Sequence, residues 1–304
     1  MEIWGLILLL VRLLLYVGMV LVQGGLLYAM LFGRQMSEAS RVHVVGLVRL
    51  GVVIGLGATC LRVPAAAANL GGDFASAFDP VFLGLMMETS LGLSSGLGVA
   101  GFVLAALLAR VAGQGRRVAS GLDVLLLAIL LLAILLLAGT SAIHGHATSG
   151  GVMTGMLIML HLFCVALWLG AFLPLHRLCR LAHDDPAVRT ELGVIARRFA
   201  HVGGMAVLLL LVSGGGMAVY LTGSISALFT TGYGQALLVK LSLVVGLIGL
   251  AALNRFRLVP AISAGDRRAV VQLGWSIRLE MAGALVILVV TSFLTTSLAL
   301  PMPL

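Results

Sequence analysis

The chain of 304 residues is 61% hydrophobic and only 10% charged, a composition typical of membrane proteins rather than soluble domains. Its net charge of +8 would suggest a nucleic-acid partner in a soluble protein. Here most of the positive charge lies in loops between apolar runs, where it faces anionic lipid headgroups, so we exclude nucleic-acid binding. The three cysteines are scattered and odd in number, and they predict no disulfide framework.

Apolar runs of the length that crosses a bilayer, about 20 residues, recur along the whole chain. The first run lacks the cleavage site of a signal peptide and is expected to remain as a span. With no long polar segment between the runs, we expect residues 1–304 to form a single integral-membrane domain. The pattern predicts an all-α polytopic membrane protein with about eight transmembrane helices, at residues 3–32, 43–61, 80–109, 122–143, 151–175, 202–221, 234–253 and 279–300.

The loops between these spans alternate in charge. Loops after the first, third, fifth and seventh spans carry nearly all the loop arginines, whereas those after the second, fourth and sixth carry only Arg62. Because arginine-rich loops stay in the cytoplasm, both termini are predicted to lie on the outer side of the membrane.

Four ionisable side chains lie within the spans at a similar depth. At 1.5 Å per helical residue, Arg12, Glu88, His161 and Lys240 all lie roughly 9 to 15 Å below the outer ends of their spans. Charges in a bilayer cost about 2.5 to 3.5 kcal/mol each on insertion scales, so they usually face a wet cavity or pair with one another. An outward-facing polar cavity is one interpretation, and a structural network of ion pairs is the other.

The fifth span begins with residues that can bind a soft metal. His144 and His146 lie in the outer loop before it, and Met153 and Met156 lie near its outer end. These four residues predict an outer mouth for a metal, although solvated loop histidines would give the same pattern.

Further donors lie deeper on the same span. At 100° per residue, Met153, His161, Cys164 and Trp168 fall within about 80° of one another, while Met159 points away. An intramembrane histidine is typical of a ligand or relay, and its structural alternative is a hydrogen bond between helices. We therefore predict a site built from His161 with thioethers and Cys164.

Methionines on other spans extend this donor set. Met87 adjoins Glu88 on the third span, and Met19 and Met217 could reach the same cavity. Thioether and imidazole together favour Cu(I), whereas harder ions prefer oxygen ligands. The donor set predicts a copper ion, with Cu(I) favoured, and no catalytic residue.

The second half of the chain carries a specific set of motifs. They are HLFCVALWLGAFLP (161–174), ARRFAHVGG (196–204), TGYGQALLVKLSL (231–243), ALNRFRLVP (252–260) and SIRLE (276–280). In this order and spacing they resemble the bacterial copper resistance protein D family of inner-membrane copper proteins. The positions that match the family are His161, Trp168, Pro174, Lys240, Asn254, Arg255 and Glu280.

The resemblance implies copper handling in the bacterial inner membrane, with import from periplasm to cytoplasm. It also implies a small periplasmic copper carrier of the CopC type as the donor, which we expect to be a separate protein. Trp168 would then plug the route below His161, or simply pack closely there. No nucleotide-binding motif such as G-x₄-G-K-[ST] is present, so transport would be passive or ion-coupled.

Two other functions fit parts of the pattern. One is a copper chaperone or sensor that does not transport. The other is a b-type haem protein for electron transfer, which needs two facing intramembrane histidines. Membrane lipids are the other expected partners, and the sequence predicts no oligomeric state.

Overall fold

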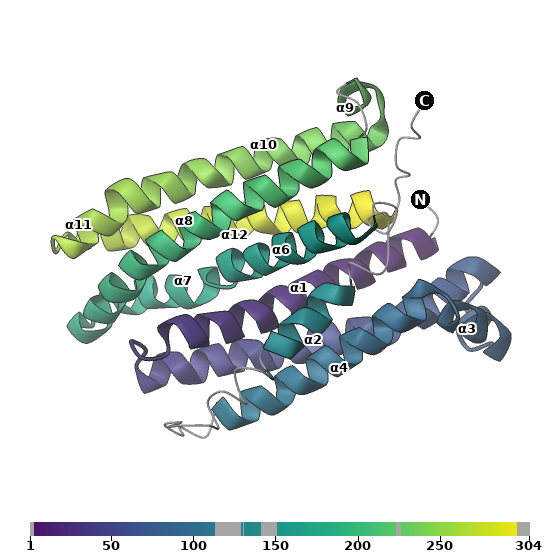
Figure 1. Ribbon diagram of the computed structural model, residues 1–304. Helices are drawn as coiled ribbons and strands as arrows, with labels where there is room; N and C mark the ends of the chain where they lie inside the picture. The colour runs from purple at the N-terminus through teal and green to yellow at the C-terminus, as the bar shows by residue number, and fades with distance from the viewer. Residues whose placement is uncertain (1–2, 113–128, 130, 141–150, 223–225, 297–304) are drawn as a thin grey trace.

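The computed structural model describes residues 3–112, 129, 131–140, 151–222 and 226–296. Within these residues every regular element is helical, and Figure 1 shows the long helices running side by side in one bundle. Seven of the described helical segments are long and apolar enough to cross a membrane. The all-α membrane architecture is therefore confirmed.

The long helices are α1 (Ile3–Phe32), α2 (Glu38–Gly71), α4 (Ser90–Ala112), α6 (Gly151–Leu169), α8 (Pro186–Thr222), α10 (Gly232–Leu253) and α12 (Arg267–Thr296). The shorter elements are η1 (Ala75–Ala77), α3 (Pro80–Met87), α7 (Phe172–Leu181), α9 (Ala227–Thr230), η3 (Asn254–Leu258) and α11 (Val259–Ser263). A short apolar helix, Leu131–Thr140, lies in the expected fourth span. Much of that span is outside the described residues, so the count of eight stays a prediction.

The expected third span is not one helix. It divides into α3 and α4 because Thr89 turns the chain between them: its hydroxyl donates to the Met86 carbonyl oxygen (2.7 Å) and accepts from the Leu91 N–H (3.2 Å). This second bond satisfies a free donor in the first turn of α4. Glu88 lies at this junction and is exposed.

Helix α2 is longer than the expected second span at residues 43–61. It continues through Pro64 and a run of alanines, which are strong helix formers, and ends at Gly72, whose φ of 81° is left-handed. Arg62 therefore lies inside the helix and not in a loop.

A break between α6 and α7 coincides with a close helix crossing. A Cβ added at Gly170 would meet the Cα of Gly24 on α1, and a Cβ at Gly24 would meet Gly170 in return. Two glycines thus let the backbones of α1 and α6 touch, which holds α6 in place against α1.

The bundle has two distinct ends. Helix α1 begins and α12 ends at the same end, which we name the terminal end (Figure 1). The opposite end, here named the basic end, carries Arg34, Arg180 and Arg267 next to the ends of α1, α7 and α12. The cavities between the described helices include one nearer each end.

Candidate functional site

The larger cavity, nearer the terminal end, has a volume of about 370 Å³ and is lined by residues of α1, α2, α6, α8, α10 and α12. Most of its lining is aliphatic. Four basic side chains also line it, Arg12, Arg62, His161 and Lys240, and no Asp or Glu of the described chain does. The cavity is therefore apolar with a strongly basic polar part.

His161 lies in this cavity in a defined orientation. The Ser213 hydroxyl on α8 donates to the Leu209 carbonyl oxygen (2.8 Å), so its oxygen is left to accept from His161 Nδ1 (3.3 Å). A proton on Nδ1 leaves Nε2 with its lone pair. The ring also lies against the backbone of Gly214, where an added Cβ would be 3.2 Å from the imidazole Cε1. With Nδ1 engaged by Ser213, Nε2 is the nitrogen of His161 that is available to bind a metal.

Two thioethers line the same cavity. Met19 on α1 is buried, and Met217 on α8 is half-buried. Among the described residues, no group of three or more His, Cys, Asp or Glu side chains gathers as a metal site would require. The soft donors of the cavity among the described residues are therefore one imidazole and these thioethers.

Several predicted donors lie elsewhere. Met153 and Met156 are 69% and 64% exposed near the start of α6, and neither lines the cavity. Cys164 is buried but is also absent from the cavity lining. Met87 is 55% exposed on α3, away from His161.

His144 and His146 lie outside the described residues. The structure therefore leaves the predicted outer mouth as a prediction.

The predicted charges are not paired with one another. Arg12 donates a hydrogen bond to the Thr295 carbonyl oxygen on α12, and Lys240 makes no hydrogen bond or ion pair with a described residue. Glu88, exposed between α3 and α4, is not part of the cavity. The described part of the chain thus contains no Arg12–Glu88–Lys240 network, and the two basic groups face the cavity instead.

Arg62 is a cavity residue that the sequence did not indicate. It is only 7% exposed, and its Nη1 is buried without a hydrogen-bond partner among the described residues. The signal that could have found it is the alanine run after Pro64, which extends the helix past the apolar segment.

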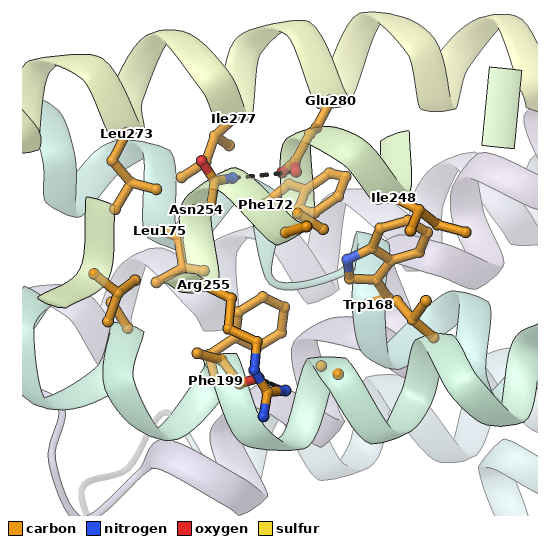
Figure 2. A pocket seen from close by; sticks show the side chains of 18 of the residues that line it. Trp168, Phe172, Leu175, Phe199, Ile248, Asn254, Arg255, Leu273, Ile277 and Glu280 are labelled. Carbon is orange, nitrogen blue, oxygen red and sulfur yellow. Dashed lines mark hydrogen bonds between the residues drawn. The ribbon is translucent and has the colours of Figure 1, made fainter. Parts of the chain in front are cut away.

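A smaller cavity of about 250 Å³ lies nearer the basic end (Figure 2). Asn254 Nδ2 donates to Glu280 Oε1 at 3.1 Å, and Arg255 donates to the Ala200 carbonyl oxygen at 2.6 Å. Asn254 opens the single π-helical turn η3, and such turns frequently occur at functional sites. This cavity brings together Asn254, Arg255 and Glu280, three of the motif residues.

The two cavities share part of their lining. Trp168, Val207 and Ile248 line both of them. Trp168 is 6% exposed and packs edge-on against Phe172, with ring centroids 5.9 Å apart (Figure 2). Its indole, with Val207 and Ile248, therefore lies between the cavity that contains His161 and the cavity that contains Glu280.

Comparison with known proteins identifies the sequences that this chain resembles. A family model described as copper resistance protein D matches residues 193–294, and one described as copper resistance protein D-like, N-terminal domain, matches residues 1–156, half of the chain. The chain is also 35% identical over 156 residues to the inner membrane protein YebZ of Escherichia coli (strain K12). That match covers 50% of the chain and 53% of the relative, so it spans about half the length of each protein.

No solved structure matches the chain. The inner-membrane relative and the seven apolar helices agree with the expected multi-pass location in the inner membrane. Family models described as copper resistance protein D match both halves, and six of the seven motif residues line the two cavities, all except Pro174. The chain belongs to the copper resistance protein D family.

Proposed function

We propose that this protein imports copper, as Cu(I), from the periplasm to the cytoplasm, with the terminal end of the bundle in the periplasm. The family supports a role in copper handling. The arginines at the basic end support the orientation, because basic residues flank the cytoplasmic ends of spans.

The observation that carries the proposal is the imidazole of His161 in the larger cavity. Its Nδ1 is bound by Ser213, which leaves Nε2 as a ligand, and the thioethers of Met19 and Met217 line the same space. Imidazole and thioether together suit Cu(I). Because few donors are available, the ion would bind weakly enough to leave again, as a transported ion must.

The path inward would run past Trp168. Copper bound at His161 would lie on the periplasmic side of the Trp168 indole. Rotation of the indole would open the smaller cavity, where Asn254 and Glu280 supply oxygen atoms. The helix break at Gly170, two residues beyond Trp168, supplies a place where the backbone can bend.

Delivery would begin at the terminal end. His144 and His146, with the exposed thioethers of Met153 and Met156, would take copper from a separate periplasmic carrier of the CopC type. Soft, exposed donors exchange a metal readily between two proteins, which suits them to this first step.

Copper accumulation in cells tests the proposal. Cells that express the wild-type protein should accumulate more cytoplasmic copper than cells without it, and His161→Ala should remove this excess. The control is His201→Ala, because His201 is exposed on α8 and lines neither cavity. Membrane abundance is measured for each variant. Accumulation that survives His161→Ala at equal abundance would show that His161 is not on the path.

The alternatives give different results in the same experiments. A chaperone or sensor would bind copper without raising the cytoplasmic content. A b-type haem protein would show a Soret absorbance band after purification. Among the described histidines only His161 lines either cavity, so the second axial ligand that such a haem needs is missing there.

A further inference from the structure

The basic groups of the larger cavity lack a counter-charge. Arg12, Arg62 and Lys240 line it, and no carboxylate of the described chain lines it or pairs with them. Buried charges are retained when they are paired or bind a ligand of opposite charge. Three cations in one cavity without an anion from the described residues indicate that a ligand of negative charge binds there.

The unpartnered guanidinium of Arg62 indicates the position at which an anion would bind. Arg62 is more than nine-tenths buried as a residue and lines the cavity, and its Nη1 is buried without a hydrogen-bond partner among the described residues. Arg12 is close enough for the two like charges to interact, and Arg12 is held by the Thr295 carbonyl oxygen. Two guanidinium groups brought together in an apolar setting repel each other unless an anion lies between them.

The chemistry of these side chains selects the anion. The planar fork of a guanidinium matches the oxygen pairs of phosphate and carboxylate groups, and an ammonium group adds a point charge. We propose that the larger cavity binds an oxyanion, a phosphate or a carboxylate, between Arg12 and Arg62, with Lys240 as the third cation.

The rest of the lining indicates the form of this anion. Aliphatic side chains such as Leu15, Leu211 and Leu294 surround the basic groups, so a hydrocarbon chain attached to the anion would also be buried. An amphiphile such as a phospholipid satisfies both parts of the cavity. A free phosphate would satisfy only the basic part.

The site also has a consequence for copper, which rests on the proposed import. A Cu(I) ion that approached His161 would be repelled by the three cations of the same cavity. An anion bound by the arginines would cancel part of that repulsion and would make binding of the ion to Nε2 more favourable.

Binding to the purified full-length protein in detergent tests the inference, with two probes. Short-chain phosphatidic acid represents the lipid-borne phosphate, and inorganic phosphate represents the free anion. Both are titrated while thermal stability is recorded. We expect phosphatidic acid to raise the midpoint of unfolding. A rise with inorganic phosphate as well would identify a free-anion site, and no rise with either probe would overturn the inference.

Substitutions locate the site. Arg62→Gln should weaken binding of the effective probe by about tenfold or more, as expected for loss of a charge-assisted pair. Arg62→Lys should retain part of it. Arg49→Gln is the matched control, because Arg49 lies on the same helix and is exposed. Equal binding by wild type and Arg62→Gln would contradict the assignment.

A purely structural role of Arg62 predicts a different pattern. If Arg62 served only to pack α2, Arg62→Gln would lower stability without the probe and leave the response to the probe unchanged. Removal of an unpartnered buried charge should instead raise stability without the probe. Lys240→Met, on a different helix, keeps the test possible if the Arg62 variant does not fold, and it should also weaken binding of the probe. Unchanged binding by Lys240→Met would contradict the assignment.

Discussion

Replacement of Ser213 by alanine should weaken copper binding without any change to a copper ligand. The Ser213 oxygen accepts from Nδ1 of His161 and thereby leaves Nε2 unprotonated. In Ser213→Ala the ring can rotate and exchange tautomers, so the lone pair is no longer held in place. The effect on copper would thus act through the orientation of the imidazole.

The size of the effect follows from the geometry. Loss of the partner that orients a metal-binding histidine typically lowers metal affinity by about 10- to 100-fold. The hydrogen bond from Nδ1 to Ser213 is 3.3 Å, slightly longer than the usual range. The loss of metal affinity should therefore lie at the lower limit of the range of about 10- to 100-fold. We expect about a tenfold loss of Cu(I) affinity, equivalent to about 1.4 kcal/mol.

Competition with a chromogenic Cu(I) chelator measures this affinity on the purified protein. Ser242→Ala is the matched control: Ser242 also donates to the carbonyl oxygen four residues before it, at 3.0 Å, but it is exposed and lines neither cavity. If Ser213→Ala binds Cu(I) as tightly as wild type while His161→Ala does not, the tautomer argument is wrong.

Two further substitutions test the path and the packing. Trp168→Ala should join the two cavities, so Cu(I) should enter proteoliposomes faster, while removal of a buried indole lowers stability by about 3 to 5 kcal/mol. Lower stability with unchanged copper entry would instead mean that Trp168 only packs. Gly24→Ala should greatly reduce the yield of folded protein on size-exclusion chromatography, because the new Cβ would meet the backbone of Gly170. Gly57→Ala, where an added Cβ meets nothing within 4 Å, should fold as wild type does, and equal yields of the Gly24 and Gly57 variants would contradict the role of the crossing.

The spans could be predicted because the bilayer imposes a length and a composition on each of them. Their ends were less predictable. The predicted second span ends at residue 61 and so places Arg62 in a loop, yet the alanines that follow continue the helix readily. The predicted depth of Glu88 depends on one continuous third helix, and the Thr89 turn divides that helix.

The candidate site was predicted in part. His161, Lys240 and Trp168 line one cavity, since residues of different helices at one depth can meet there, and their role in copper binding stays a prediction. The sequence could not predict that Cys164 lies outside the cavity. A helical wheel gives the angles between residues of one helix, but it does not show which face of that helix packs against a neighbouring helix. That choice depends on contacts such as Gly24 with Gly170, which involve residues far apart in the sequence.

Entry of Cu(I) into proteoliposomes that contain only the purified protein tests the central claim most directly. Wild type should admit Cu(I) faster than protein-free vesicles, and His161→Ala at equal protein content should reduce entry to the protein-free rate. His201→Ala should behave as wild type. No entry with wild type would favour a chaperone or sensor, and entry that persists in His161→Ala would contradict the path proposed for copper.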